Sequence, residues 1–158
     1  MILQKNDGKF LVDLEKTKAY YQSHSLCDCQ ACRNFYQQAS AAFPKLKAFL
    51  ADFGVDLERP DEIAWGDLSP EGEIDYLFVA YTVRGEILRQ DFYETDLQDS
   101  LFLSVVIDKG YVPNEQEGED YFVISVYNIV LPWVLEEPFG DPIKPSFFQR
   151  LKKRFGKD

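Results

Sequence analysis

The chain has 158 residues, enough for one domain with a buried core, and its 46% hydrophobic and 15% aromatic content excludes a globally disordered protein. Its formal net charge of −10 argues against nucleic acid as the main partner, because binding to phosphates requires exposed Lys and Arg. No apolar run approaches the roughly 20 residues of a membrane helix and no secretory signal opens the sequence, so we expect a cytoplasmic protein without membrane association.

Residues 1–28 are expected to form an N-terminal arm of the single domain, which spans residues 1–158. Asn6-Asp7-Gly8 is a strong turn signal, and the apolar residues from Phe10 to Leu14 favour a short pair of strands around it. One or two helical turns are expected from Thr17 to Gln22.

The densest chemistry of the chain lies between His24 and Tyr36, HSLCDCQACRNFY, which holds the only histidine and all three cysteines. A helix is expected to begin here, with Asp28 as the N-cap residue. Cys29 and Cys32 then fall in the first turn, where the positive end of the helix dipole favours a thiolate. The helical spacing is that of Ala31, Phe35, Ala39 and Ala42.

Zinc binding is one function that this cluster predicts, with His24, Cys27, Cys29 and Cys32 as ligands. Thiolates and a neutral imidazole are the ligands that zinc prefers, and Cys29 and Cys32 have the two-residue spacing of a zinc knuckle. Against this, zinc sites usually take their second pair of ligands from a distant segment, whereas these four residues lie within nine consecutive positions.

Thiol redox chemistry is a second interpretation, because Cys-x-x-Cys at a helix N-terminus lowers the pKa of the attacking thiol. Thioredoxin-like proteins place this motif after a buried strand, while the preceding segment here, TKAYYQSHSL, reads as helix or loop. A nucleophilic Cys27 with His24 as base lacks a third orienting group. Free cysteines are often buried as small apolar side chains, and the sequence favours this interpretation over zinc binding, thiol redox chemistry or a nucleophilic cysteine.

The tract CDCQACRNFY, followed by FLADFGVDLERPDE, resembles a group of uncharacterised bacterial proteins with a C-x-C-x-x-C-R-N-[FY] element before a helical pair. The resemblance covers about a third of the chain, from His24 to Glu62. It implies no activity, cofactor or partner for these positions.

A helical pair is expected over residues 29–54. Pro44 disfavours helical geometry at Phe43 and can serve as the first residue of the second helix, which Gly54 caps. The buried stripe of this second helix consists of Leu46, Phe49, Leu50 and Phe53.

Residues 62–135 are expected to form an antiparallel sheet of four strands, or slightly more, in a meander. Arg84-Gly85 is interpreted as a two-residue turn that makes a hairpin of the strands on either side of it. The expected strands are Ile74–Val83, Glu86–Glu94, Leu101–Asp108 and Tyr121–Leu131, with Ile63–Trp65 as a short extra strand and Pro132 as the terminator.

Both faces of the last two strands carry large apolar side chains, so both must be covered. Either the terminal segments supply the second layer or the protein forms a homodimer through its sheet.

The acidic residues at the predicted turns could include the catalytic carboxylate pair of a hydrolase, but solvated surface charge is the favoured interpretation. They are Glu71, Glu73, Asp75, Asp91, Glu94, Asp96, Asp99, Glu115, Glu117, Glu119 and Asp120.

Residues 144–158, KPSFFQRLKKRFGKD, are expected to form a short basic amphipathic helix. They hold six Lys and Arg against one Asp, so the preceding 143 residues carry a formal charge of −15. Packing of this basic segment on the acidic body is favoured over an external target or a membrane.

The sequence therefore predicts a single α+β domain: an antiparallel meander packed against the helical pair, followed by the amphipathic helix. The favoured function is a non-enzymatic protein-interaction module whose acidic surface binds a basic partner protein. The alternative is a zinc or thiol-redox protein centred on the cysteine cluster.

Overall fold

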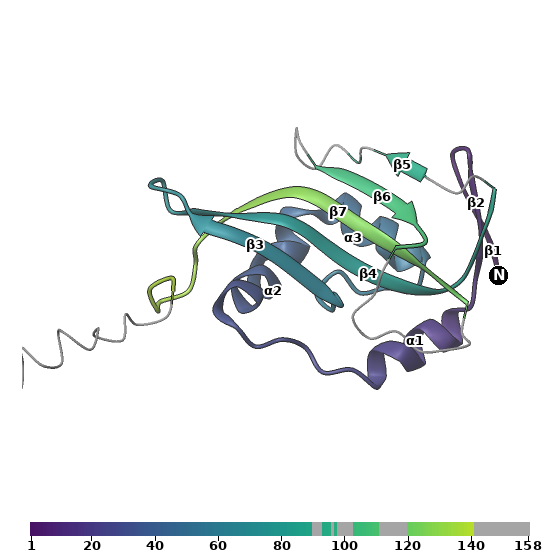
Figure 1. The fold of residues 1–158 in the computed structure, drawn as a ribbon, viewed down its shortest axis with the longest axis horizontal. Coiled ribbons are helices and arrows are strands. Elements are labelled where there is room, and N and C mark those ends of the chain that lie inside the picture. The colour runs from purple at the N-terminus through teal and green to yellow at the C-terminus, as the bar shows by residue number, and fades with distance from the viewer. Residues whose placement is uncertain (90–92, 96, 98–102, 111–119, 141–158) are drawn as a thin grey trace, which may run out of the picture.

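The computed structural model describes residues 1–89, 93–95, 97, 103–110 and 120–140, in which three helices pack on an antiparallel sheet (Figure 1). This arrangement confirms the α+β class. The helices are α1 (Leu14–Gln22), α2 (Gln30–Ala42) and α3 (Pro44–Asp52). The strands are β1 (Ile2–Lys5), β2 (Gly8–Val12), β3 (Glu62–Leu68), β4 (Glu73–Arg89), β5 (Tyr93–Thr95), β6 (Ser104–Asp108) and β7 (Tyr121–Pro132).

The sheet is built around β4, whose 17 residues pair with three neighbouring strands. The described part of the sheet has the strand order β1-β2-β4-β7-β6-β5, and β3 also pairs with β4. β7 pairs with β4 along one edge, from Glu73 to Arg84. β3 pairs with the first half of β4, and β2 pairs with its last residues from Gly85 onward. One long strand thus ties together both ends of the sheet.

The expected turn at Arg84-Gly85 is wrong, because β4 continues through both residues. Gly85 has φ +149° and lies against β2, where a Cβ atom would be 1.9 Å from the carbonyl oxygen of Leu11. The glycine is therefore needed for the close approach of two backbones, which is one of the two common reasons for glycine in a strand. The glycine that suggested a hairpin turn is instead required by a contact with Leu11, which is distant in the sequence.

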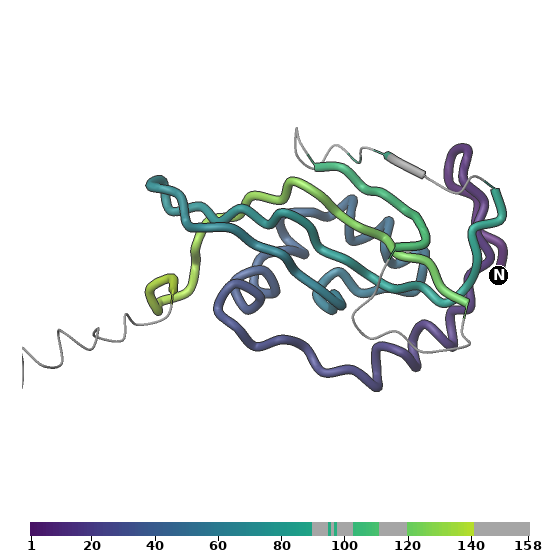
Figure 2. Tube along the Cα trace, in the orientation of Figure 1, coloured from purple at the N-terminus to yellow at the C-terminus, as the bar shows by residue number. Residues whose placement is uncertain are grey.

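The hairpin of β1 and β2 lies at one end of the sheet, where the purple tube crosses the direction of the other strands (Figure 2). Its turn contains Asn6 in the left-handed region with φ 46°, a conformation that asparagine tolerates better than most residues. β2 brings Phe10 into the core, where its ring contacts those of Phe53 and Phe122 at 5.4 and 5.5 Å between centroids. This aromatic contact joins the hairpin, α3 and β7.

Helices α2 and α3 lie behind the sheet in Figure 1 and cover one of its faces. Pro44 is the first residue of α3, directly after Phe43, and Gly54 follows the helix with φ 77°. On the face turned away from the helices, Tyr127 and Val130 remain 38% and 51% exposed. The homodimer stays a prediction. The packing of the terminal segment also stays a prediction, since residues 144–158 lie outside the described part of the chain.

Side chains of α1 close the gap that β3 and β2 leave along the second edge of β4. β3 begins at Glu62 opposite Ala80 and β2 ends at Val12 opposite Gly85, so Thr82 and Arg84 face no strand on that edge. The Tyr21 hydroxyl bonds both backbone groups of Thr82, and the Thr17 hydroxyl accepts the Arg84 N–H at 3.0 Å. None of the described helices is long and apolar enough to cross a membrane.

Candidate metal centre

The cysteine cluster lies at the start of α2, which begins at Gln30 with Cys29 as its N-cap residue. Cys29 has an extended backbone and makes no side-chain cap bond. The expected capping role of Asp28 is therefore wrong, because Asp28 precedes the cap by one residue. Its carbonyl instead accepts a bond of 2.8 Å from Nε of Arg33.

The three cysteine sulfurs converge. The Sγ atoms of Cys27, Cys29 and Cys32 all lie within 4.8 Å of one another, and none of the three residues forms a disulfide. Cys27 is exposed, Cys29 is half-buried and Cys32 is buried. Four bonds of about 2.3 Å in a tetrahedron would place neighbouring sulfurs roughly 3.8 Å apart. The observed arrangement is thus close to what a thiolate metal site needs.

His24 is not part of this group of converging ligands. Its ring packs against that of Tyr20 at 4.2 Å between centroids with an interplanar angle of 38°, and its Nδ1 lies 2.6 Å from the Tyr20 carbonyl oxygen. A second contact of the same nitrogen, at 3.0 Å, is with the Ser23 hydroxyl. These contacts tie the imidazole to the last turn of α1, so the structure brings together three of the four predicted ligands.

The thiols differ in their electrostatic surroundings. The pKa of Cys27 is lowered, mainly because the backbone N–H of Cys29 bonds to its sulfur. The pKa of Cys32 is raised, first by burial and then by the neighbouring Cys29 thiol. Tyr36 packs beside the cluster, where its hydroxyl donates to the Cys27 carbonyl oxygen at 3.0 Å. Burial and the nearby Cys32 raise the pKa of that hydroxyl.

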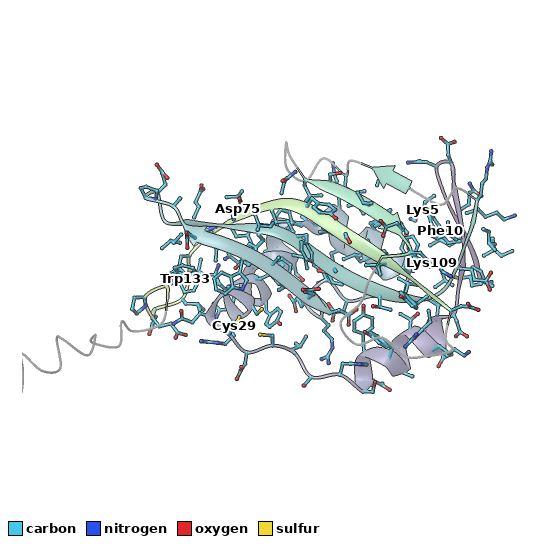
Figure 3. The ribbon with its side chains drawn as sticks, in the orientation of Figure 1. Lys5, Phe10, Cys29, Asp75, Lys109 and Trp133 are labelled. Carbon is cyan, nitrogen blue, oxygen red and sulfur yellow. The ribbon has the colours of Figure 1, made fainter. Side chains whose placement is uncertain are left out.

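The segment after β7, residues 133–140, folds back over the start of α2, and Figure 3 shows Trp133 and Cys29 at the same end of the sheet. Arg33 forms an ion pair with Glu137, and Gln30 donates to the same carboxylate at 3.0 Å. These two bonds lower the pKa of Glu137. Gln30 also accepts the N–H of Gly140 at 3.0 Å.

A pocket of about 630 Å³ lies between this segment, β3 and the start of α2. We call it the Trp65 pocket. It begins at the cysteine cluster, because Cys29 is one of its lining residues. The others are Gln30, Ala31, Arg33, Trp65, Asp67, Glu137, Phe139 and Gly140. Sequence reasoning missed this site, since its residues come from three distant segments and carry no shared motif.

The carboxylates at the expected turns do not form a comparable cluster in the described residues. Glu71, Glu73 and Asp75 are exposed around the tip between β3 and β4, and they are not among the converging potential metal ligands. The remaining acidic turn residues that could have completed a hydrolase pair lie mostly outside the described part of the chain.

No family model, no curated protein and no solved structure matches the chain. The resemblance to proteins with a C-x-C-x-x-C-R-N-[FY] element therefore stays a prediction.

Proposed function

We propose that the chain binds a zinc ion through Cys27, Cys29 and Cys32. The observation that supports this proposal is the convergence of the three Sγ atoms within 4.8 Å at the start of a helix. Cys29 at the cap position and Cys32 in the first turn of α2 supply two of the three ligands. The exposure of Cys27 gives an ion access from solvent.

Zinc accounts for all three sulfurs, whereas a disulfide would join two of them and leave the third without a role. With His24 held against Tyr20, the proposed site has three protein ligands and one coordination position for water or another ligand. The Cys29–Cys32 disulfide is the second thiol chemistry that the same cluster supports.

Metal analysis of tag-free protein, purified without oxygen, tests this proposal. We expect about one equivalent of zinc per chain. Replacement by Co²⁺ should give the near-ultraviolet charge-transfer absorption of cobalt thiolates. Cys32→Ser should remove most of the metal. Protein without metal, whose thiols form a reversible disulfide in air, would overturn the zinc proposal in favour of redox chemistry.

His24→Ala is the matched control for the cysteine variants. Its zinc content should equal that of the unchanged protein, because the imidazole contacts Tyr20 and Ser23. Loss of zinc in this variant would instead support the four-ligand site predicted from the sequence.

A second proposed function is recognition of a basic partner protein by the acidic surface. It is supported by the formal charge of −15 on residues 1–143 and by a pocket with two carboxylates and exposed aromatic surface. Titration with an oligolysine 15-mer should show binding that weakens as salt is added, since exposed charges are screened. An oligoglutamate of equal length is the control, and equal binding of both would count against recognition by charge.

A further inference from the structure

The Trp65 pocket has aromatic walls. The ring of Trp65 packs edge to face against Phe139 at 5.8 Å between centroids, and Phe139 packs in the same way on Trp133 at 5.2 Å. Trp133 is held in place because its Nε1–H donates to the Glu137 carbonyl oxygen at 2.8 Å. Trp65 nevertheless stays 42% exposed although it lies in a strand. An indole fixed in this way can interact with a ligand through its uncovered surface.

The ionisable side chains that line the pocket carry excess negative charge. Asp67 and Glu137 are acidic and Arg33 is basic. Arg33 already forms an ion pair with Glu137 and donates to the Asp28 carbonyl oxygen. The charge of Asp67 is therefore not balanced by the cation that lines the pocket. A negative carboxylate beside aromatic rings favours a cation, because the faces of indole rings also attract positive charge.

We propose that the Trp65 pocket receives a lysine or arginine side chain of a basic partner protein. Its volume of about 630 Å³ is in the usual range for small-ligand sites and exceeds what one such side chain fills. The methylene groups of the side chain contact Trp65 and Phe139, and the charged group approaches Asp67. This inference rests on the proposed recognition of a basic partner and assigns it to one place on the surface.

The two tryptophans provide a direct test, because Trp65 and Trp133 are the only ones in the chain. The full chain is titrated with the capped tripeptides Gly-Lys-Gly, Gly-Arg-Gly and Gly-norleucine-Gly while indole fluorescence and the two indole N–H signals are recorded. The lysine and arginine peptides should shift the Trp65 signal at millimolar concentration, whereas norleucine, which has the same carbon chain without charge, should bind at least about fivefold more weakly.

Asp67→Asn should weaken binding of the lysine peptide about fivefold, since it removes the negative charge that Arg33 does not balance and keeps the side-chain volume. Asp75→Asn is the matched control, because Asp75 is an exposed carboxylate on β4 that does not line the pocket. If the oligolysine binds but the tripeptides leave the Trp65 signal unchanged, or if both variants behave alike, the pocket is not the site and only the general interaction remains. If the oligolysine does not bind either, the proposed function fails together with the inference.

Discussion

The Tyr21 hydroxyl makes the two backbone hydrogen bonds at Thr82 that a neighbouring strand would otherwise make. It donates to the Thr82 carbonyl oxygen at 2.9 Å and accepts the Thr82 N–H at 2.8 Å, so one side chain satisfies both backbone groups of a strand residue. Asp61 supports the arrangement, because its carboxylate also accepts the Thr82 N–H and the Tyr20 hydroxyl, each at 2.8 Å. Helix α1 is thereby bonded to the middle of the sheet.

Tyr21→Phe should lower the free energy of unfolding by about 2 kcal/mol, because the buried Thr82 carbonyl would lose its partner. The Thr82 N–H keeps its bond to Asp61, which limits the loss. Urea denaturation followed by circular dichroism measures the change. Tyr127→Phe, on the exposed face, is the control and should cost less than about 0.5 kcal/mol. Equal effects of the two substitutions would mean that the Tyr21 bonds contribute nothing.

Stability should fall at alkaline pH because of the buried tyrosines. Burial raises the pKa of Tyr21 and Tyr81 well above its ordinary value and that of Tyr76 to about 12. In the unfolded chain these hydroxyls ionise near pH 10, so above that pH the unfolded state loses protons that the folded state keeps. The contribution is complete below pH 10 and is lost as pH rises through the folded pKa values, at up to about 1.4 kcal/mol per pH unit for each tyrosine.

Urea denaturation at several pH values between 9 and 11.5 measures this dependence, and absorbance at 295 nm reports phenolate formation. The slope should become smaller in Tyr21→Phe, which removes one of the groups. A free energy of unfolding that stays constant across this range would contradict the prediction.

Gly85→Ala should destabilise the protein by about 3 kcal/mol or more. A Cβ atom there would lie 1.9 Å from the Leu11 carbonyl oxygen, and the φ of +149° is one that alanine rarely adopts. Gly72→Ala is the matched control, because Gly72 also has positive φ, +81°, but no heavy atom lies within 4 Å of its added Cβ. This control should cost about 1 kcal/mol. Similar melting temperatures for the two variants would show that β2 can move away from Gly85.

Asn34→Ala should cost about 3 kcal/mol, because Asn34 is fully buried and its amide makes three bonds. It donates to Tyr76 and to the Pro132 carbonyl oxygen, each at 3.1 Å, and accepts the Val134 N–H at 2.8 Å. Gln38→Ala, one turn further along α2, removes a half-exposed amide that bonds the same carbonyl and should cost less than about 1 kcal/mol. Chemical denaturation of both variants compares them. The expectation fails if the two losses are equal.

Local sequence signals predicted the elements whose boundaries depend on local chemistry. Pro44 separates two helices because its ring restricts the preceding residue, and Asn6-Asp7-Gly8 forms the turn between β1 and β2. The proximity of the three cysteines followed from their spacing alone. The start of α2 differs from the prediction by one residue, since the cap residue is Cys29 and not Asp28.

The remaining features depend on contacts between distant segments. Gly85 has the local appearance of a turn, yet its role is to admit the backbone of Leu11. His24 is close to the cysteines in the sequence, whereas its contacts with Tyr20 hold it away from their sulfurs. Nothing in residues 133–140 themselves indicates that Gln30 and Arg33 would bond to them. The basic segment 144–158 lies outside the described residues, so its expected helix stays a prediction.

The hydroxyl and carboxylate groups that occupy the second edge of β4 also have a protective consequence. An uncovered strand edge is a template onto which another molecule can add a strand, and such additions propagate into fibrils. Loss of α1, by proteolysis or by a substitution that releases Tyr21 from Thr82, would uncover this stretch between β3 and β2. Helix α1 therefore also protects the protein from self-assembly through this strand edge.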